Sequence, residues 1–166
     1  MNLFLMRHAD AISQNNTSDE ERNLSSKGRL QAIQTASFLQ THYFNRVIIS
    51  SVKRALETFK IINKIIKIEN MKISDNLYKK NEEEILEEIK LLGGDANNLL
   101  VIGHNPSISR LVQKISLNEN TKIIKENNVS PASVIVINCK NITNWSNLNI
   151  LVKTHITEVF VPKIWE

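Results

Sequence analysis

Several residue types that mark special classes of protein are scarce in this chain of 166 residues. The single cysteine, Cys139, excludes a disulfide framework and a cysteine-based metal cluster. Three prolines and four glycines are too few to form a flexible linker, and no domain break is visible. We therefore expect one domain that spans residues 1–166.

Long hydrophobic runs are also absent. No stretch approaches the roughly 18 consecutive apolar residues of a membrane-spanning helix. The apolar run at residues 3–6 is too short for the core of a signal peptide. We therefore expect a protein of the reducing cytoplasm that has no membrane partner.

Basic residues form no block along the chain. Against 21 Lys and Arg stand 17 Asp and Glu, which gives a formal net charge of +4 at pH 7. A surplus of this size favours anionic partners through long-range attraction. The lysines are scattered and no aromatic residues are interleaved with them, so we expect no nucleic-acid partner.

Short apolar runs alternate along the sequence with segments in which apolar residues recur at the spacing of an α-helix. The clearest apolar runs, each typical of a buried strand, are residues 3–7, 46–50 and 98–103. Such alternation over two-thirds of the chain predicts a mainly parallel sheet with helices on both faces. A short strand at 71–73 and an amphipathic helix over 82–92 fit this pattern.

The last third of the chain has a different pattern. Residues 133–139 are rich in β-branched side chains, and residues 145–152 alternate in part, which predicts a closing hairpin. No clear element is predicted beyond it. The expected fold is thus a three-layer α/β/α arrangement, with a mainly parallel sheet of about six strands and one antiparallel strand.

Polar residues indicate where the helices begin. Ser25 or Ser26 can cap the first helix, whose apolar face would hold Leu30, Ile33, Ala36, Phe38 and Leu39. Serines also precede the second helix, so Ser50 and Ser51 are candidate caps there. Asn105 suits a helix cap and Pro106 the first helical position that follows it.

Charged and polar side chains follow three of the predicted strands. They are Arg7-His8, the stretch from Ser50 to Arg54, and Gly103-His104-Asn105. In α/β folds the groups that touch a ligand lie just past the carboxyl ends of parallel strands. Two histidines and two arginines are therefore expected to converge on one site.

These motifs resemble those of the histidine phosphatase superfamily, branch 1, and most closely its short SixA-type phosphohistidine phosphatases. The matching segments are Arg7-His8-Ala9-Asp10, Arg22-Asn23-Leu24-Ser25 with Gly28, Ser50 through Arg54-Ala55 to Glu57-Thr58, and Gly103-His104-Asn105-Pro106. Each segment alone is weak evidence, but all of them occur in order and at strand ends. The resemblance implies the phosphoglycerate mutase-like form of the α/β/α fold.

The resemblance also implies roles for individual residues. His8 would be the nucleophile and would form a phosphohistidine intermediate, which water then hydrolyses. Arg7, Arg54 and His104 would bind the phosphoryl group, because guanidinium groups suit bidentate bonds to its oxygens. The residues Arg22 and Asn105 are expected to contribute to phosphate binding as well. No metal ion and no cofactor is required.

The charge state of His8 can be argued from its neighbours. A nucleophilic imidazole must be neutral, and its reference pKa is about 6.5. Nearby cations disfavour a further positive charge, so we expect Arg7 and Arg54 to help keep His8 neutral. His42 and His155 belong to none of the motifs and are expected to be surface or core residues.

The proton donor is the open position in this scheme. Many branch 1 members have a glutamate after the third strand, whereas this chain has only Glu82, Glu83 and Glu84 at the start of a predicted helix. Asp10 and Glu82 are the candidate donors. A phosphohistidine substrate would depend little on a donor, because its P–N bond breaks readily, and SixA-type members also lack this acid.

The resemblance and the lack of a clear proton donor favour a metal-independent phosphatase that acts on phosphohistidine of a protein partner, such as a histidine phosphotransfer domain in signal transduction. The connections are short, so we expect an open pocket on a monomer. Two alternatives remain open at the level of the sequence. One is a small-molecule phosphomonoesterase, which needs a proton donor, and the other is a non-catalytic phosphate-binding module.

Overall fold

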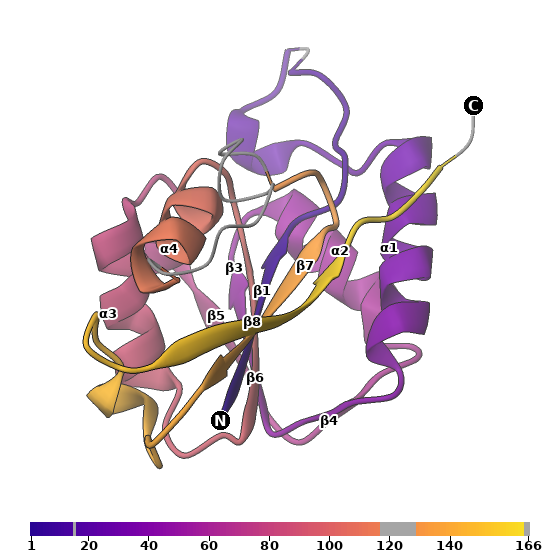
Figure 1. Ribbon diagram of the computed structural model, residues 1–166. Coiled ribbons are helices and arrows are strands. Elements are labelled where there is room, and N and C mark those ends of the chain that lie inside the picture. The colour runs from indigo at the N-terminus through magenta and orange to yellow at the C-terminus, as the bar shows by residue number, and fades with distance from the viewer. Residues whose placement is uncertain (15, 117–128, 165–166) are drawn as a thin grey trace.

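The protein is built around one mixed β-sheet that lies between two layers of helices (Figure 1). The computed structural model describes residues 1–14, 16–116 and 129–164. The strands in this part of the chain are β1 (Asn2–Arg7), β2 (Tyr43–Phe44), β3 (Arg46–Ser50), β4 (Lys67–Ile68), β5 (Met71–Ser74), β6 (Asn98–Gly103), β7 (Val134–Cys139) and β8 (Thr154–Phe160). The α-helices are α1 (Ser26–Leu39), α2 (Lys53–Ile62), α3 (Glu82–Leu92) and α4 (Ser107–Ile115). Short 3-10 helices are η1 (Asp19–Glu21), η2 (Asp75–Leu77) and η3 (Trp145–Asn147).

The order of the strands confirms the predicted α/β fold. Among the described residues the main sheet has six strands in the order β5-β3-β6-β1-β7-β8. The first four are parallel, and β7 runs antiparallel to both of its neighbours. Because β1, β3 and β6 are adjacent and parallel, their carboxyl ends lie at one edge of the sheet.

The alternation of side chains along β1 explains the two helical layers. Leu3 and Leu5 belong to the hydrophobic cluster on the side of α3 and α4. Phe4 and Met6 point the other way, into the cluster that α1 and α2 cover (Figure 1). Since both faces of this strand are buried, its sequence is a continuous apolar run, as expected for a central parallel strand.

The buried face of α1 differs from the predicted one. Leu30 and Ile33, expected on the apolar face, are 53% and 48% exposed. The side of α1 that faces the protein consists mainly of small and polar residues: Gly28, Gln31, Ala32, Thr35, Ala36 and Leu39. A methyl group on Gly28 would collide with the carbonyl oxygen of Asp10. The close approach of α1 to the loop after β1 therefore excludes a side chain at position 28.

The predicted hairpin is wrong in its second strand. Residues 145–147 form η3, and buried Trp145 donates from its indole nitrogen to the carbonyl oxygen of Ala96 at 2.7 Å. The strand that pairs with β7 is β8, in the tail where no element was predicted. A register shift between Val136 and Ile137 places Ile156 and Phe160 against opposite clusters, which hides the alternation in the sequence.

Two smaller observations complete the fold. β2 and β4 pair as a separate two-stranded sheet that the sequence did not predict. Across the described residues, no helix is long and apolar enough to span a membrane.

Candidate active site

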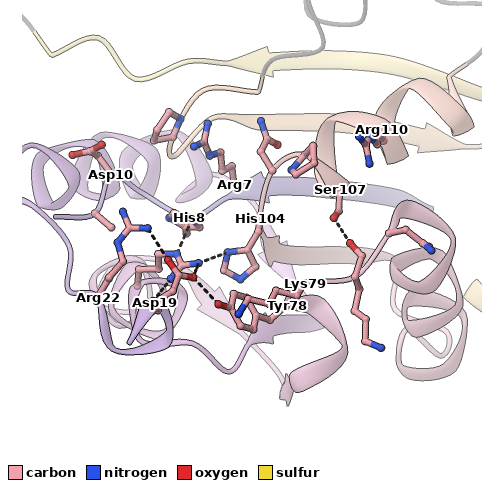
Figure 2. Close-up of a pocket in the computed structure, with 17 residues that line it drawn as sticks. Arg7, His8, Asp10, Asp19, Arg22, Tyr78, Lys79, His104, Ser107 and Arg110 are labelled. Atoms are coloured by element: carbon pink, nitrogen blue, oxygen red, sulfur yellow. Dashed lines mark hydrogen bonds and ion pairs between the residues drawn. The ribbon is translucent and has the colours of Figure 1, made fainter. Parts of the chain in front are cut away.

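A cavity of about 520 Å³ lies at the carboxyl edge of the parallel strands (Figure 2). Most of the residues that line it are polar or charged. The residues that line it are Arg7, His8, Asp10, Ala11, Asp19, Arg22, Arg54, Tyr78, Lys79, Lys80, Asn81, His104, Asn105, Pro106, Ser107, Arg110 and Pro131. The three predicted strand ends thus meet in one place.

The ring of His8 is held in one tautomer by contacts on both nitrogens. Its Nδ1 lies 2.7 Å from the carbonyl oxygen of Ala9, which can only accept a hydrogen bond. Its Nε2 lies 3.1 Å from Nε of Arg54, and a guanidinium can only donate. The proton of the neutral ring is therefore on Nδ1, and the lone pair of Nε2 accepts from Arg54 at the wall of the cavity.

The surroundings of His8 also keep its ring neutral. Burial lowers the pKa of His8 to about 4, and the positive charges of Arg54, Arg7 and Arg22 contribute to the same effect. The hydrogen bond to Ala9 acts in the opposite direction without cancelling it. Burial is thus the main cause of the neutral ring, whereas the sequence argument had relied on the arginines alone.

The second histidine is fixed in a similar way. Nη2 of Arg54 lies 3.4 Å from Nδ1 of His104, which must therefore accept, and the ring proton is then on Nε2. This nitrogen lies 2.7 Å from Oγ of buried Ser50. Burial, followed by the neighbouring His8 and Arg54, lowers the pKa of His104 to about 2. The two imidazole rings, with centroids 4.9 Å apart, are both neutral.

Arg54 links the two histidines from the first turn of α2. The helix begins at Lys53 with Val52 as its cap, and no side chain caps it. The prediction of a serine cap was wrong here, because the hydroxyl of Ser50 contacts His104 instead. The Arg54 side chain is only 6% exposed. A buried guanidinium in contact with two neutral rings is well placed to neutralise an anion between them.

Two side chains of α2, those of Glu57 and Thr58, bond to the backbone of the loop that follows β1. Thr58 donates to the carbonyl oxygen of Arg54 at 2.7 Å and accepts from the backbone nitrogen of Ala9 at 3.0 Å. Glu57 accepts from the backbone nitrogen of Leu24 at 2.7 Å. These side chains anchor both ends of the loop, and so fix where His8 lies relative to α2.

Arg7 and Asn105 form the wall nearest to β7. Nη1 of Arg7 and Nδ2 of Asn105 both donate to the carbonyl oxygen of Val129, at 3.0 and 2.9 Å. Nε of Arg7 is buried and has no hydrogen-bond partner among the described residues. Asn105 is not the predicted helix cap, because α4 begins at Ser107 and the Asn105 Oδ1 accepts from Ser109 Oγ at 3.0 Å.

Arg22 reaches the cavity from the loop after β1, where it contacts Asp19. Its Nη1 donates to Oδ1 of Asp19 at 2.9 Å, and its Nε donates to the carbonyl oxygen of Ile12 at 2.8 Å. Asp19 also accepts from Arg54 and from the hydroxyl of Tyr78 (Figure 2). These bonds, that of Tyr78 foremost, hold the pKa of Asp19 far below its usual value.

The two candidate proton donors occupy different places. Asp10 lines the cavity, and its Oδ2 accepts from Ser25 Oγ at 2.5 Å. Glu82 is the first residue of α3 and is not among the described residues that line the cavity. Asn81 caps this helix and forms a capping box with Glu84. The side chain of Glu84 is thus bonded to the backbone at the start of the helix.

Three residues that shape the cavity escaped the sequence argument: Asp19, Ser50 as a partner of His104, and Tyr78. Asp19 looked like one acid in a polar loop, and Tyr78 follows no motif. The ring of Tyr78 lies edge-on to His104, with centroids 5.4 Å apart, and the guanidinium carbon of Arg54 is 5.6 Å from the centre of that ring. Only Ser50 carried a signal, because it lies at the end of a predicted strand.

Metal ligands do not gather at the cavity. Over the described ranges, no group of three or more His, Cys, Asp or Glu side chains is arranged to hold a metal ion. Positive charge near His8 comes instead from the guanidinium groups of Arg7, Arg22 and Arg54. The arrangement can therefore bind a compact anion through charge-assisted hydrogen bonds.

Comparisons with known proteins agree with this geometry. The family model of the histidine phosphatase superfamily (branch 1) matches residues 3–81, a range that includes Arg7, His8, Arg22 and Arg54. No curated protein matches the sequence significantly.

Solved structures match over nearly the whole chain. A candidate phosphohistidine phosphatase SixA from Nakamurella multipartitia is 26% identical, with a TM-score of 0.78 over 97% of this chain and 95% of that one. The protein histidine phosphatase SixA complexed with tungstate is 20% identical, with a TM-score of 0.77 over 98% and 97%. A candidate SixA from Agrobacterium tumefaciens is 16% identical, with a TM-score of 0.79 over 97% of each chain. The sequence motifs, the match of residues 3–81 to the histidine phosphatase superfamily (branch 1) and the fold shared with SixA structures thus agree with one another.

Proposed function

We propose that the protein is a phosphatase that hydrolyses phosphohistidine on a partner protein, with His8 as its nucleophile. The match of residues 3–81 to the histidine phosphatase superfamily supports phosphatase activity in general. The substrate is inferred from the site and from the SixA-like structures. The partner would be a small signalling protein, such as a histidine phosphotransfer domain, met by a monomer in the cytoplasm.

The observation that carries the proposal is the state of His8. A neutral ring with Nδ1 bonded to Ala9 leaves its lone pair on Nε2, at the wall of a cavity lined by cations. This lone pair accepts from Nε of Arg54, a hydrogen bond that must open before His8 attacks phosphorus. Attack on phosphorus needs this lone pair, and the charge that gathers on the phosphoryl oxygens needs nearby donors. Arg7 and Arg54 supply guanidinium donors, and Arg22 and Asn105 supply further donors at the wall.

The reaction would run in two balanced steps. In the first, Nε2 of His8 forms a bond to phosphorus while the P–N bond of the substrate breaks, and the substrate imidazole leaves with a proton from solvent or from Asp10. In the second, water attacks phosphorus, the bond to His8 breaks, and inorganic phosphate leaves. His104, neutral and beside His8, would contact the phosphoryl oxygens in both steps.

The small supply of proton donors favours a good leaving group. Among the described residues that line the cavity, the carboxylates are those of Asp10 and Asp19. Asp19 is held ionised by Tyr78 and two arginines, so it cannot readily give up a proton. A phosphohistidine substrate is consistent with this supply, since imidazole leaves more easily than an alkoxide.

The test is transfer and hydrolysis with a phosphorylated histidine phosphotransfer domain. Wild-type protein is expected to release phosphate from it and to form an acid-labile, alkali-stable phosphoenzyme. His8→Ala should lose both activities by at least about 10³-fold, the scale on which loss of a covalent nucleophile acts. His155→Asn, at an exposed position of β8, is the matched control and should keep them. Undiminished activity of His8→Ala would disprove the proposal.

A small-molecule phosphomonoesterase is the second candidate, and the size of the cavity favours it. A volume of about 520 Å³ lies within the range of small-ligand sites. Ester hydrolysis needs a proton donor, and Asp10 is the one candidate donor that lines the cavity. Faster turnover of a phosphate ester than of the phosphoprotein, lost in Asp10→Asn, would establish this function instead. A protein that binds phosphate without forming any phosphoenzyme would be a non-catalytic binding module.

A further inference from the structure

The carboxylate of Asp19 lies among the donors that a phosphoryl group would use. Its Oδ1 accepts from Nη1 of Arg22 at 2.9 Å. Its Oδ2 accepts from Nη2 of Arg54 at 3.1 Å and from the hydroxyl of Tyr78 at 2.6 Å. All of these donors line the cavity. A carboxylate surrounded by two guanidiniums and a phenol is bonded in the way that a bound anion would be.

Every nitrogen of Arg54 already has a contact, and both Nη atoms contact Asp19. Nε of Arg54 contacts His8, and Nη2 contacts both His104 and the Asp19 carboxylate. Nη1 donates to the backbone carbonyl oxygen of Asp19 at 2.6 Å. Of the four Nη hydrogens of Arg54, Asp19 accepts two and His104 accepts one, so a phosphoryl group bonded to Arg54 by more than one of them competes with Asp19.

The segment that carries Asp19 is attached by charge rather than by apolar packing. No residue of η1 is buried. Its other acids form ion pairs at the protein surface, from Glu20 to Lys79 at 3.6 Å and from Glu21 to Lys53 at 3.8 Å. Exposed pairs of this kind contribute little to stability and are screened by salt. The pairs of Glu20 and Glu21 therefore add little to the attachment of η1, which depends mainly on the hydrogen bonds that Asp19 accepts.

We propose that Asp19 is an internal anion that occupies the phosphoryl site in the free protein and that substrate must displace. The inference rests on the proposed function in one respect, that the cavity binds a phosphoryl group. The site then binds phosphate only in the fraction of molecules in which η1 has moved away. Its apparent affinity is lower than its intrinsic affinity by that fraction.

This competition would make Asp19 a selectivity device. A monoanion such as chloride or a single carboxylate gains no more from Arg54 and Arg22 than Asp19 does, and Asp19 is already tethered there. A phosphoryl dianion carries a second charge and a third terminal oxygen, so it can displace the carboxylate. Selectivity for dianions over monoanions should therefore fall when the charge of Asp19 is removed.

The test is binding of inorganic phosphate, measured by calorimetry on wild type and on Asp19→Asn. The variant keeps the shape of the side chain and loses its charge. It should bind phosphate about tenfold more tightly, as expected if the open form is a minor fraction of about one tenth. The control is Asp75→Asn, which neutralises an exposed aspartate that also begins a 3-10 helix but lies outside the cavity. This control should bind phosphate like wild type.

Hydrogen exchange on the wild-type protein gives a second readout that needs no variant. Saturating phosphate should speed exchange of the backbone amides of residues 19–22, because it releases η1 from the cavity. Equal or weaker phosphate binding by Asp19→Asn, or slower exchange of these amides, would show that Asp19 positions the arginines and would overturn the proposal. If neither protein bound phosphate, this inference and the phosphate site would both fail. If binding behaved as expected without hydrolysis of phosphohistidine, only the proposed function would fail.

Discussion

The floor and the rim of the cavity are built on different physical principles. The floor, made of His8, Arg54 and His104, is buried and held by hydrogen bonds to both rings. The rim, made of η1 with Lys53 and Lys79, is held by ion pairs whose side chains reach 69% exposure. The floor is thus preorganised before any anion arrives, whereas the rim can rearrange at little cost.

Replacing Arg54 by lysine should cause the largest loss, because it breaks the floor at its centre. Lysine keeps the charge but cannot contact His8 and His104 together through separate nitrogens. We expect phosphoenzyme formation to slow by about 10³-fold, the scale on which removal of a positioned charge donor acts. Rapid-quench measurement of the phosphoenzyme checks this. Arg29→Lys, on the exposed side of α1, is the control, and equal rates for the two variants would contradict the role of Arg54.

The pKa of His8, in the floor of the cavity, is expected to differ from that of an ordinary exposed histidine. Burial and three arginines lower the pKa of His8 to about 4, so the ring stays neutral as the pH falls through the usual histidine range. At pH 5 about 90% of His8 would be neutral, against about 3% for a histidine of pKa 6.5, a difference of roughly thirtyfold. An NMR titration of the ring, assigned with His8→Asn, measures it directly. A midpoint near 6.5 would contradict the buried, cationic surroundings.

Ser50→Ala tests how much the hydrogen bond between Ser50 and His104 contributes to the floor. The variant removes the hydroxyl that contacts Nε2 of His104 and leaves the ring held through Nδ1 by Arg54 alone. We expect about a tenfold loss in kcat with little change in phosphate affinity, since a misplaced ring costs more in the transition state than in binding. Ser50→Thr should restore part of the loss. Ser133→Ala is the matched control, because that buried hydroxyl has no hydrogen-bond partner among the described residues.

The floor was largely predictable from sequence and the rim was not. His8, Arg54 and His104 follow strands, and adjacency of parallel strands dictates that such residues meet. Asp19 lies in an irregular loop, whose path depends on the contacts it makes rather than on a repeating pattern. Nothing in the spacing of residues 11–23 predicts that Asp19 pairs with Arg54 while Glu20 and Glu21 pair with lysines. Tyr78 was missed for the same reason.

The fold shows the same division. The parallel strands were predicted because both of their faces are buried, which leaves a continuous apolar run. The edge strand β8 was missed because it is half exposed and its bulge shifts the alternation between Ile156 and Phe160. The buried face of α1 was misjudged because tight packing at Gly28 selects small residues there, and the pattern of large apolar residues marks the outer side.

The smallest expected effect lies at the rim. Lys79→Gln removes the partner of Glu20 in a pair that is exposed on both sides. Loss of such a pair should change phosphate affinity by no more than about twofold and leave the rate of phosphoenzyme formation unchanged. Any increase in affinity should disappear at high salt, because salt already screens this pair in the wild type. A loss comparable to that of Arg54→Lys would mean that the rim is as rigid as the floor, and Asp19 could not then be displaced by an arriving phosphoryl group.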